Sequence, residues 1–342
     1  MRKSENHSIV LSGMRPTGAL HLGHYTGALE NWVALQDVYT NYHLIADYHA
    51  LTTNTDTSRI FENTIEMVID WLAAGIDPAR SPIFRQSQVK QHTELFLIFS
   101  MLVTKNRLER NPTLKEQVRD LGIESENLAY GHLGYPVLQA SDILLYRAHA
   151  VPVGEDQLAN IEITREIARR FNREYGEVFP EPKALLTEFK RLPGLDGIDR
   201  KMSKSLGNTI LLSDTPETIA AKLRKAVTDP LKVRRNDPGR PDVCLVFTYH
   251  RRFNAGEIDE IRAGCTSGAL GCVECKQRCA ARIADALAPH REHRVPYEKD
   301  RSLVLDILAE GEKKARRRAA TTMRAVHRAM RLGGRIGKTS VS

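Results

Sequence analysis

The sequence predicts an α/β protein built on a parallel sheet, and three observations support this fold class. Residues 9–29 pass from a short apolar run through a Gly- and Pro-containing turn into a helical pattern. Residues 151–171 repeat that order, and short apolar runs alternate with amphipathic helices between the two segments. Strands that alternate with helices form a parallel sheet covered on both faces, with ligands at the carboxyl ends of the strands. The expected core is therefore Rossmann-like.

The first element is a buried strand that leads into a turn suited to binding a phosphate. Ile9 to Leu11 form the apolar run, and Gly13, Pro16 and Gly18 then interrupt regular structure. Helical spacing begins at about Leu22. A loop that opens a helix directs free N–H groups and the positive end of the helix dipole at one spot, which suits an anion.

Two histidines stand at the start of this helix. His21 and His24 can each donate to a phosphate oxygen, and Gly23 lets a base or ribose approach the backbone. A cap or a surface histidine pair is the alternative interpretation of the same residues.

The next elements follow in order. Residues 42–46 and 82–85 read as strands, and 58–76 as an amphipathic helix with Ser58 as its N-cap. Residues 94–104 read as an apolar helix, and 106–121 as a charged, loop-rich segment.

The helix expected over 135–146 has Pro136 in its first turn and a carboxylate among its apolar residues. That carboxylate, Asp142, is costly to bury unless it is hydrogen-bonded. Asp142 is therefore either a structural partner or an acceptor for a ligand. Residues 151–157 read as a short strand and Gly turn, followed by a helix to about Phe171.

The second half begins with a cationic loop and continues as helices. Lys201-Met202-Ser203-Lys204-Ser205 combines two lysines with small hydroxyl residues, which suits a mobile arm; a charged surface turn is the alternative. Helices are expected over 215–227, 257–263 and 273–287, and a long C-terminal helix presents one apolar face that includes Gly311.

Composition limits the class of protein. The chain has 342 residues and a formal charge of +8, which suits a polyanionic partner. The polar start lacks a signal core, and the longest apolar run, residues 95–103, is too short to cross a bilayer. All five cysteines fall within 244–279. A soluble cytoplasmic protein with a local metal site is the expectation.

Two motifs together carry a family resemblance. His-Leu-Gly-His at 21–24, followed by Lys-Met-Ser-Lys-Ser at 201–205, resembles the class I aminoacyl-tRNA synthetases. The segment Tyr-Pro-Val-Leu-x-Ala-x-Asp from Tyr135, with Val-Pro-Val-Gly-Glu-Asp-Gln from Val151, is similar to the bacterial tryptophanyl-tRNA synthetases. This resemblance extends over about residues 8–332.

The resemblance implies a domain organisation and a reaction. It implies a Rossmann-like catalytic domain over 1–205, an inserted all-helical anticodon-recognition domain over 206–301, and a C-terminal helix over 302–342 that packs back on the catalytic domain, with room for a disordered tip. The reaction implied is activation of L-tryptophan by ATP to tryptophanyl-AMP and pyrophosphate, then transfer to the 3′ end of tRNA(Trp). Mg²⁺ on the phosphates and a homodimer through the larger domain are also implied.

The resemblance further implies roles for individual residues. Lys201, Lys204, His21 and His24 are the expected catalytic residues. The ATP site is expected to comprise Arg15, Pro16, Thr17, Gly23, His24, Gly154, Glu155, Asp156, Leu192, Lys201, Met202, Ser203, Lys204 and Ser205. The tryptophan pocket is expected to comprise Asp142, Gln157, Tyr135, Gln139, His49, Leu11 and Gly13. Asp142 would accept the indole N–H, which discriminates against phenylalanine.

The cysteine spacing points to a metal centre. Cys244, Cys265, Cys272 and Cys275 resemble the four ligands of a [4Fe–4S] cluster carried by some tryptophanyl enzymes, and Cys279 is the spare. Four thiolates can equally hold a structural zinc ion, and the spacing does not separate the two.

Two other hypotheses remain at this stage. Relatives often have an aromatic residue in place of Leu11 and a methionine in place of Gln139, which motivates a paralogue that keeps the fold as an RNA-binding or regulatory protein. An unrelated nucleotidyltransferase with similar phosphate motifs is the third hypothesis.

The helical region also contains candidate contacts to RNA phosphates, with a solvated basic loop as the alternative. These candidates are Arg234, Arg235, Arg240, Arg251 and Arg252.

Overall fold

The computed structural model describes residues 8–186 and 192–332, so the predicted C-terminal tip lies outside the described residues. Within this part of the chain, five parallel strands form one sheet in the order β3-β2-β1-β4-β5. The strands are β1 (Ile9–Met14), β2 (Thr40–Ile45), β3 (Ile83–Arg85), β4 (Ala150–Val153) and β5 (Lys183–Leu186). The predicted fold class, a Rossmann-like parallel sheet accompanied by a helical region, is confirmed.

The strand order creates a crevice beside β1. Strand β1 pairs with β2 on one side, where Ser12 is opposite His43, and with β4 on the other, where Val10 is opposite Ala150. The chain therefore leaves β1 toward one half of the sheet and later fills the other half. Parallel sheets bind ligands outside the carboxyl ends of the strands at such a switch point.

Helices cover both faces of the sheet. Trp32 and Trp71 pack with Ile45 and Ile83 in one apolar cluster, whereas Leu11, Leu44 and Phe84 belong to the other. The side chains of successive strand residues point to opposite faces, which explains why neighbours such as Leu44 and Ile45 fall in different clusters. The helices that lie on or between the strands are α1 (Leu22–His24), a π-helical turn (Tyr25–Leu29), α2 (Glu30–Leu35), α3 (Asp47–Ala50), α4 (Ile60–Ala73), α5 (Gln91–Ser100), α6 (Lys105–Glu109), α7 (Pro112–Asp120), α8 (Tyr130–Leu133), α9 (Tyr135–Leu145) and α10 (Leu158–Tyr175).

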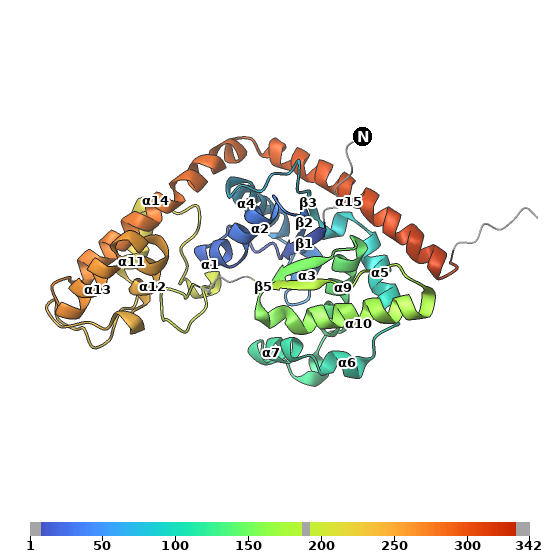
Figure 1. The fold of residues 1–342 in the computed structure, drawn as a ribbon, viewed down its shortest axis with the longest axis horizontal. Coiled ribbons are helices and arrows are strands. Elements are labelled where there is room, and N and C mark those ends of the chain that lie inside the picture. Colours follow the sequence, from blue (N-terminus) through green and yellow to red (C-terminus); the bar gives the residue numbers. More distant parts are fainter. Residues whose placement is uncertain (1–7, 187–191, 333–342) are drawn as a thin grey trace, which may run out of the picture.

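A helical region follows the sheet, and two long helices join them. The region contains α11 (Pro216–Arg224), α12 (Leu245–Phe253), α13 (Ile258–Ser267) and the first part of α14 (Cys272–Lys299). Figure 1 shows α14 rising from this region over α4, and α15 (Arg301–Ala329) continuing across the sheet. The boundaries predicted at residues 205 and 301 remain predictions, because α14 packs on α11, α12 and α4 alike.

Helix α15 approaches the sheet closely at one glycine. The Arg85 Nε donates to Glu312 Oε1 over 2.7 Å, and the Glu312 side chain is 6% exposed. Beside this pair, a Cβ added at Gly311 would lie 1.9 Å from the carbonyl oxygen of Ile83 in β3. Only glycine allows α15 to lie this close, so the predicted return of the C-terminal helix to the sheet depends on Gly311.

We therefore expect Gly311→Ala to destabilise the protein by about 2–3 kcal/mol, the usual cost of forcing extra volume into a packed contact. Chemical denaturation measures this difference. Gly256→Ala is the matched control, because a Cβ at Gly256 meets no atom within 4 Å. Equal stability of the two variants would contradict this account of the docking.

His43 makes the stability of the fold depend on pH. Its ring is fully buried and stacks on Trp32 with the ring centroids 5.3 Å apart. Burial lowers the pKa of His43 to about 3 from its usual value of 6.5. Between these two values the unfolded chain binds a proton that the folded chain does not, so stability is lost as pH falls below about 6.5.

The expected loss attributable to His43 is about 2 kcal/mol between pH 7 and about pH 5. His43→Phe keeps an aromatic ring and removes the titration. Urea denaturation at the two pH values should give a smaller pH dependence for this variant than for the wild type. The same pH dependence in both proteins would contradict the prediction.

Five features of the chain differ from the sequence prediction. Ser58 is not the N-cap of its helix: α4 begins at Ile60, and Arg59 occupies the cap position. Residues 106–121 are not loop-rich, because Thr104 and Asn111 cap the short helices α6 and α7. Strand β5 and helix α12 were not predicted. Helix α14 continues beyond residue 287 to Lys299, through two internal prolines.

Candidate active site

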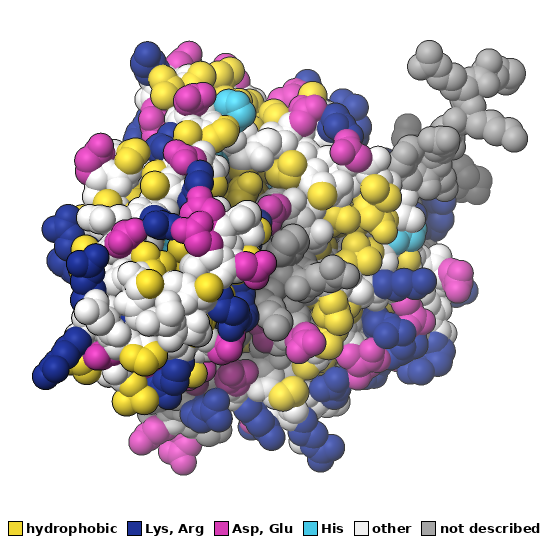
Figure 2. Space-filling model, turned by 60° about the vertical axis from the view of Figure 1, so that its left-hand side comes forward, with side chains coloured by type: hydrophobic (Ala, Val, Ile, Leu, Met, Phe, Trp, Pro, Cys, Tyr) yellow, Lys and Arg dark blue, Asp and Glu magenta, His cyan; other side chains and the backbone are white. Residues whose placement is uncertain are grey.

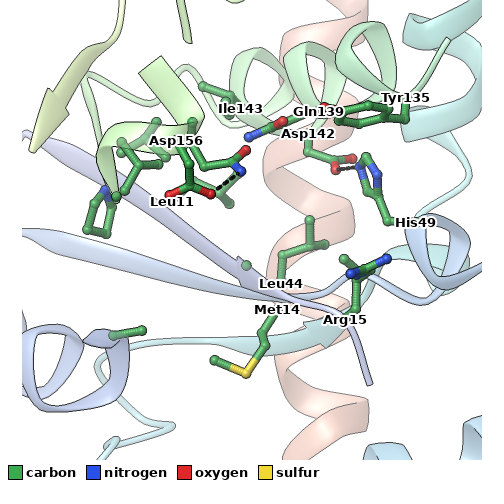
Figure 3. A pocket seen from close by; sticks show the side chains of 18 of the residues that line it. Leu11, Met14, Arg15, Leu44, His49, Tyr135, Gln139, Asp142, Ile143 and Asp156 are labelled. Atoms are coloured by element: carbon green, nitrogen blue, oxygen red, sulfur yellow. Dashed lines mark hydrogen bonds and ion pairs between the residues drawn. The ribbon is translucent and has the colours of Figure 1, made fainter. Parts of the chain in front are cut away.

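A pocket of about 470 Å³ opens at the carboxyl ends of β1, β2 and β4. Strand β1 and the turn after it contribute Leu11, Gly13, Met14 and Arg15, while α9 forms the opposite wall (Figure 3). All seven residues predicted for the tryptophan pocket line this one cavity: Leu11, Gly13, His49, Tyr135, Gln139, Asp142 and Gln157. The sheet thus brings these seven together, while their individual roles remain predictions.

The wall from α9 owes its composition to helical spacing. Tyr135, Gln139 and Asp142 lie four and three residues apart, so they share one face of the helix. Figure 3 shows Gln139 and Tyr135 beside Asp142 at the top of the pocket. This wall offers one aromatic ring and two polar groups, which suits a flat ligand that carries an N–H donor.

Asp142 is held by three side chains from other elements. Its Oδ1 accepts from His92 Nδ1 over 2.6 Å and from Gln86 Nε2 over 2.7 Å. Its Oδ2 accepts from His49 Nε2 over 2.9 Å. On its other side, His92 Nε2 is hydrogen-bonded to the Tyr146 hydroxyl over 2.9 Å. These hydrogen bonds offset the cost of burying a carboxylate that is 2% exposed.

The network also keeps the carboxyl group ionised. Burial by itself raises the pKa of Asp142, but His92 and His49 outweigh that effect, so its pKa lies below the usual value. Gln86 Nε2 also lies 3.0 Å from Oδ2, so each oxygen already accepts two hydrogen bonds. A ligand donor would therefore share an oxygen with one of these partners or replace it.

Gln86, His92 and Tyr146 were missed by the sequence analysis. Gln86 directly follows β3, and His92 lies in the first turn of α5. The carboxyl end of a parallel strand is where functional side chains collect, so the position of Gln86 carried a usable signal. Tyr146 offered none, because an aromatic residue at the end of an apolar helix is typical of the core.

A second polar group lies opposite Asp142. Asn160 Nδ2 donates to the Tyr135 hydroxyl over 3.2 Å and to Gln157 Oε1 over 2.9 Å. Gln157 Nε2 in turn donates to Asp156 Oδ2 over 2.9 Å (Figure 3). Asn160 was also missed, although it orients two of the predicted pocket residues.

The first motif forms the mouth of the pocket. The rings of His21 and His24 stack with their centroids 3.7 Å apart. The backbone N–H of His21 donates to His24 Nδ1 over 3.3 Å. Burial, followed by the nearby Lys204 charge, lowers the pKa of His21 to about 4. Burial lowers the pKa of His24 to about 3, with smaller contributions from the nearby His21 and Lys204. Both rings are neutral near pH 7, and His24 lines the pocket with its proton on Nε2.

The lysine loop folds onto this mouth. The Lys204 ammonium donates to the carbonyl oxygens of Thr17 and Ala19, the latter over 2.9 Å. A Cβ at Gly23 would lie 3.5 Å from Met202 Sδ, so the two motifs touch at a second point. Burial lowers the pKa of Lys204. The two motifs, far apart in the chain, therefore meet at one place.

The remaining ATP-site predictions divide into two groups. Arg15, His24, Gly154 and Asp156 line the same pocket as the tryptophan candidates. The pocket lining does not include Pro16, Thr17, Gly23, Glu155, Leu192 or residues 201–205. Asn208, which was missed, shapes the loop: its Oδ1 accepts from the Ser203 N–H over 2.7 Å, and its Nδ2 donates to the Lys201 carbonyl over 2.9 Å.

The cysteines gather in the helical region as free thiols. Burial, together with the neighbouring thiols of Cys244, Cys265 and Cys272, raises the pKa of Cys275 to about 12. The chemistry of the donors suits a metal centre. Even so, within residues 8–186 and 192–332 no group of three or more His, Cys, Asp or Glu side chains is arranged to hold a metal ion.

The fold and the site together define a class. A parallel sheet whose carboxyl edge combines a His-x-Gly-His helix mouth with a docked Lys-Met-Ser-Lys-Ser loop is the nucleotide-binding architecture of a class I aminoacyl-tRNA synthetase.

Comparison with known proteins gives the family. The sequence profile of the tRNA synthetases class I (W and Y) matches residues 3–288, and the chain belongs to this family. A tryptophan–tRNA ligase of Thermotoga maritima is 50% identical, over 94% of this chain and 99% of its own length. A tryptophan–tRNA ligase of Aquifex aeolicus is 43% identical, also over 94% of this chain and 99% of its own length. A crystal structure of the Campylobacter jejuni tryptophanyl-tRNA synthetase with ADP and tryptophan has a TM-score of 0.84 at 32% identity, covering 95% of this chain and 100% of that one.

Proposed function

We propose that the chain is a tryptophan–tRNA ligase. It activates L-tryptophan with ATP to tryptophanyl-AMP and pyrophosphate, and it transfers the tryptophanyl group to the 3′ end of tRNA(Trp). The observation that carries this proposal is the buried, ionised Asp142 beside Tyr135 on the wall of the pocket at the switch point of the sheet. Relatives at 43–50% identity that bear this name support it.

The proposed chemistry needs positioning and charge neutralisation. The tryptophan carboxylate oxygen attacks the α-phosphorus of ATP, and the bond to the β-phosphate oxygen breaks as pyrophosphate leaves. Lys204 and Lys201 would stabilise the charge that moves onto the pyrophosphate, and His24 would donate to a phosphate oxygen. The first-motif turn and Gly154 to Asp156 would hold the nucleotide. We further propose that Mg²⁺ binds through the phosphates and water.

Amino-acid selection follows from the pocket. We propose that Asp142 accepts the indole N–H, while Tyr135 and Gln157, oriented by Asn160, hold the α-amino group. Leu11, Gly13, His49 and Gln139 would complete the pocket. A buried acceptor left without its N–H partner penalises phenylalanine, so the site needs no editing step to reject it.

ATP–pyrophosphate exchange with each of the twenty amino acids tests the function. Exchange that depends on tryptophan is expected, followed by charging of tRNA(Trp) in an aminoacylation assay. Exchange with tyrosine and not tryptophan would overturn the assignment. No exchange with any amino acid, combined with tRNA binding on filters, would favour the paralogue that binds RNA without catalysis.

The helical region is the proposed site of anticodon recognition. Figure 2 turns this region toward the viewer and shows Lys and Arg side chains along its left and lower edges, with acidic side chains between them. Three of the candidate arginines already have partners: Arg240 pairs with Asp229, Arg251 with Asp242, and Arg252 with Glu30. Arg234 and Arg235 line a separate hollow beside the start of α14, and we propose these two as the RNA contacts.

We propose that Cys244, Cys265, Cys272 and Cys275 hold a [4Fe–4S] cluster, with a structural zinc ion as the alternative. Their spacing and their convergence in one region support a shared ligand set. Such a cluster would tie α12, α13 and α14 together and supply no step of the ligase reaction. Protein purified without oxygen should contain iron and sulfide and absorb broadly in the visible range, as expected for thiolate-bound iron. A colourless protein with one zinc ion would establish the alternative.

Assembly and location complete the proposal. We propose a homodimer through the sheet-containing region, where Leu97 of α5 and Met101 directly after it are 57% and 72% exposed. Equilibrium sedimentation at micromolar concentration tests this, and a monomer would refute it. None of the helices in the described ranges is long and apolar enough to span a membrane. We propose the cytoplasm, where tRNA is charged, as its location.

A further inference from the structure

A buried carboxylate outside the pocket connects the nucleotide turn with helix α14. Asp70, on α4, is fully buried. Its Oδ2 accepts from the Leu20 backbone N–H over 2.6 Å. Its Oδ1 accepts from His290 Nε2 over 3.0 Å and from Arg294 Nη1. Asp70 has no role in the reaction proposed above.

The Leu20 contact belongs to the turn that receives the lysine loop. The carbonyls that bind the Lys204 ammonium are those of Thr17 and Ala19, and Ala19 immediately precedes Leu20. Between them Gly18 has a φ of 89°, which only glycine adopts without strain. The Leu20 carbonyl also accepts from the Leu212 N–H over 2.9 Å. The N–H held by Asp70 therefore fixes the end of a tight turn whose carbonyls face Lys204.

The other two contacts come from α14, one helical turn apart. His290 and Arg294 lie on its buried side, and Arg294 also pairs with Glu66 and Glu298. Further toward its start, α14 packs on α11 and α12 of the helical region. Asp70 is thus shared between the nucleotide turn and the helix that reaches the helical region.

We infer that Asp70 is a positioning residue for adenylate formation. Its carboxylate holds the Leu20 N–H and thereby sets the 17–20 turn in the shape that binds Lys204 and admits ATP. Because Arg294 and His290 of α14 contact the same carboxylate, the shape of the turn depends on where α14 lies. The inference rests on the proposed function, because adenylate formation is the reaction that function assigns. The effect of the Asp70–Leu20 contact is expected on ATP binding alone.

The competing explanation is that Asp70 only neutralises Arg294 in the core. The two explanations differ in the contact that matters: the Leu20 N–H in the first, the Arg294 charge in the second. Removing both charges together separates them. Asp70→Asn with Arg294→Met leaves an uncharged site that still offers an oxygen to Leu20. Asp70→Leu with Arg294→Met leaves an uncharged site of similar volume without that oxygen.

Isothermal titration calorimetry with ATP compares these two double variants in the full-length protein. We expect D70L/R294M to bind ATP at least about tenfold more weakly than D70N/R294M, in line with the loss of one buried hydrogen bond. The KM for tryptophan should differ by less than about twofold between them. Equal ATP affinity in the two double variants would overturn the inference.

Two additions keep the test decisive. Glu66→Gln removes another partner of Arg294 without touching Leu20, and we expect its ATP affinity to match the wild type.

If D70L/R294M does not fold, an ester in place of the Leu20 amide removes the N–H and keeps every side chain. Unchanged ATP affinity of this ester protein would then contradict the inference. Calorimetry needs no amino acid, so failure of the tryptophan assignment would appear in the exchange assay alone.

Discussion

Lys204→Ala is expected to lower kcat for tryptophan-dependent ATP–pyrophosphate exchange by about 10²–10³-fold, the usual effect of removing one group that stabilises transition-state charge. The ammonium lies at the Thr17 and Ala19 carbonyls, at the mouth where the phosphates would bind. Negative charge moves toward the leaving pyrophosphate during the reaction, so the interaction is strongest in the transition state. The KM for ATP should therefore change much less than kcat.

The matched control is Lys225→Ala, which removes an exposed lysine after α11 and should leave kcat within about twofold. Stopped-flow measurement of the first turnover separates adenylate formation from product release. A Lys204→Ala protein that forms adenylate at the wild-type rate would contradict the role proposed for the lysine loop. Lys201→Ala tests the second lysine in the same way.

Asp142→Asn is expected to lower kcat/KM for tryptophan by roughly 10–100-fold, corresponding to a hydrogen bond from the indole to a charged acceptor. The variant keeps the shape of the side chain but loses the charge that His92 and His49 share. The amide nitrogen also turns one acceptor into a donor. Selectivity for tryptophan over phenylalanine should fall together with kcat/KM, because both depend on the same acceptor.

Asp47→Asn provides the comparison for Asp142→Asn. Asp47 is also a buried aspartate, and its Oδ1 accepts from the Ser87 N–H over 2.9 Å, but it does not line the pocket. Both variants should lose some stability, whereas only Asp142→Asn should lose selectivity. Urea denaturation measures the stability of the two variants, and steady-state exchange at saturating ATP measures their selectivity. Unchanged tryptophan selectivity in Asp142→Asn would move the specificity determinant elsewhere in the pocket.

The effect of Asp142→Asn also depends on residues behind the pocket. Gln86 donates to both oxygens of Asp142, over 2.7 and 3.0 Å, and His92 connects the carboxylate to Tyr146 in the core. These partners hold the acceptor in one orientation before any ligand arrives. Preorganisation of this kind lowers the entropic cost of binding and sharpens discrimination.

Local sequence patterns predicted most of the elements around the site and the chemical types of its residues, but not strand β5 or helix α12. The apolar run, glycines and helical spacing of residues 9–29 predicted a strand, turn and helix that are present. An aspartate inside the apolar pattern of 135–146 identified Asp142, because a buried carboxylate requires a polar partner. Patterns failed at 106–121, where the helix caps Thr104 and Asn111 lie in a charged segment that resembles a loop.

What the sequence determined by itself was the α/β class, the two phosphate-type motifs and the presence of a carboxylate that needs a partner. Tertiary structure alone decided which partners meet: Gln86 and His92 with Asp142, the turn carbonyls with Lys204, and Leu20 and α14 with Asp70. Periodicity and capping depend on neighbours within a few residues. Contacts between residues 50 to 224 positions apart depend instead on strand order and helix packing.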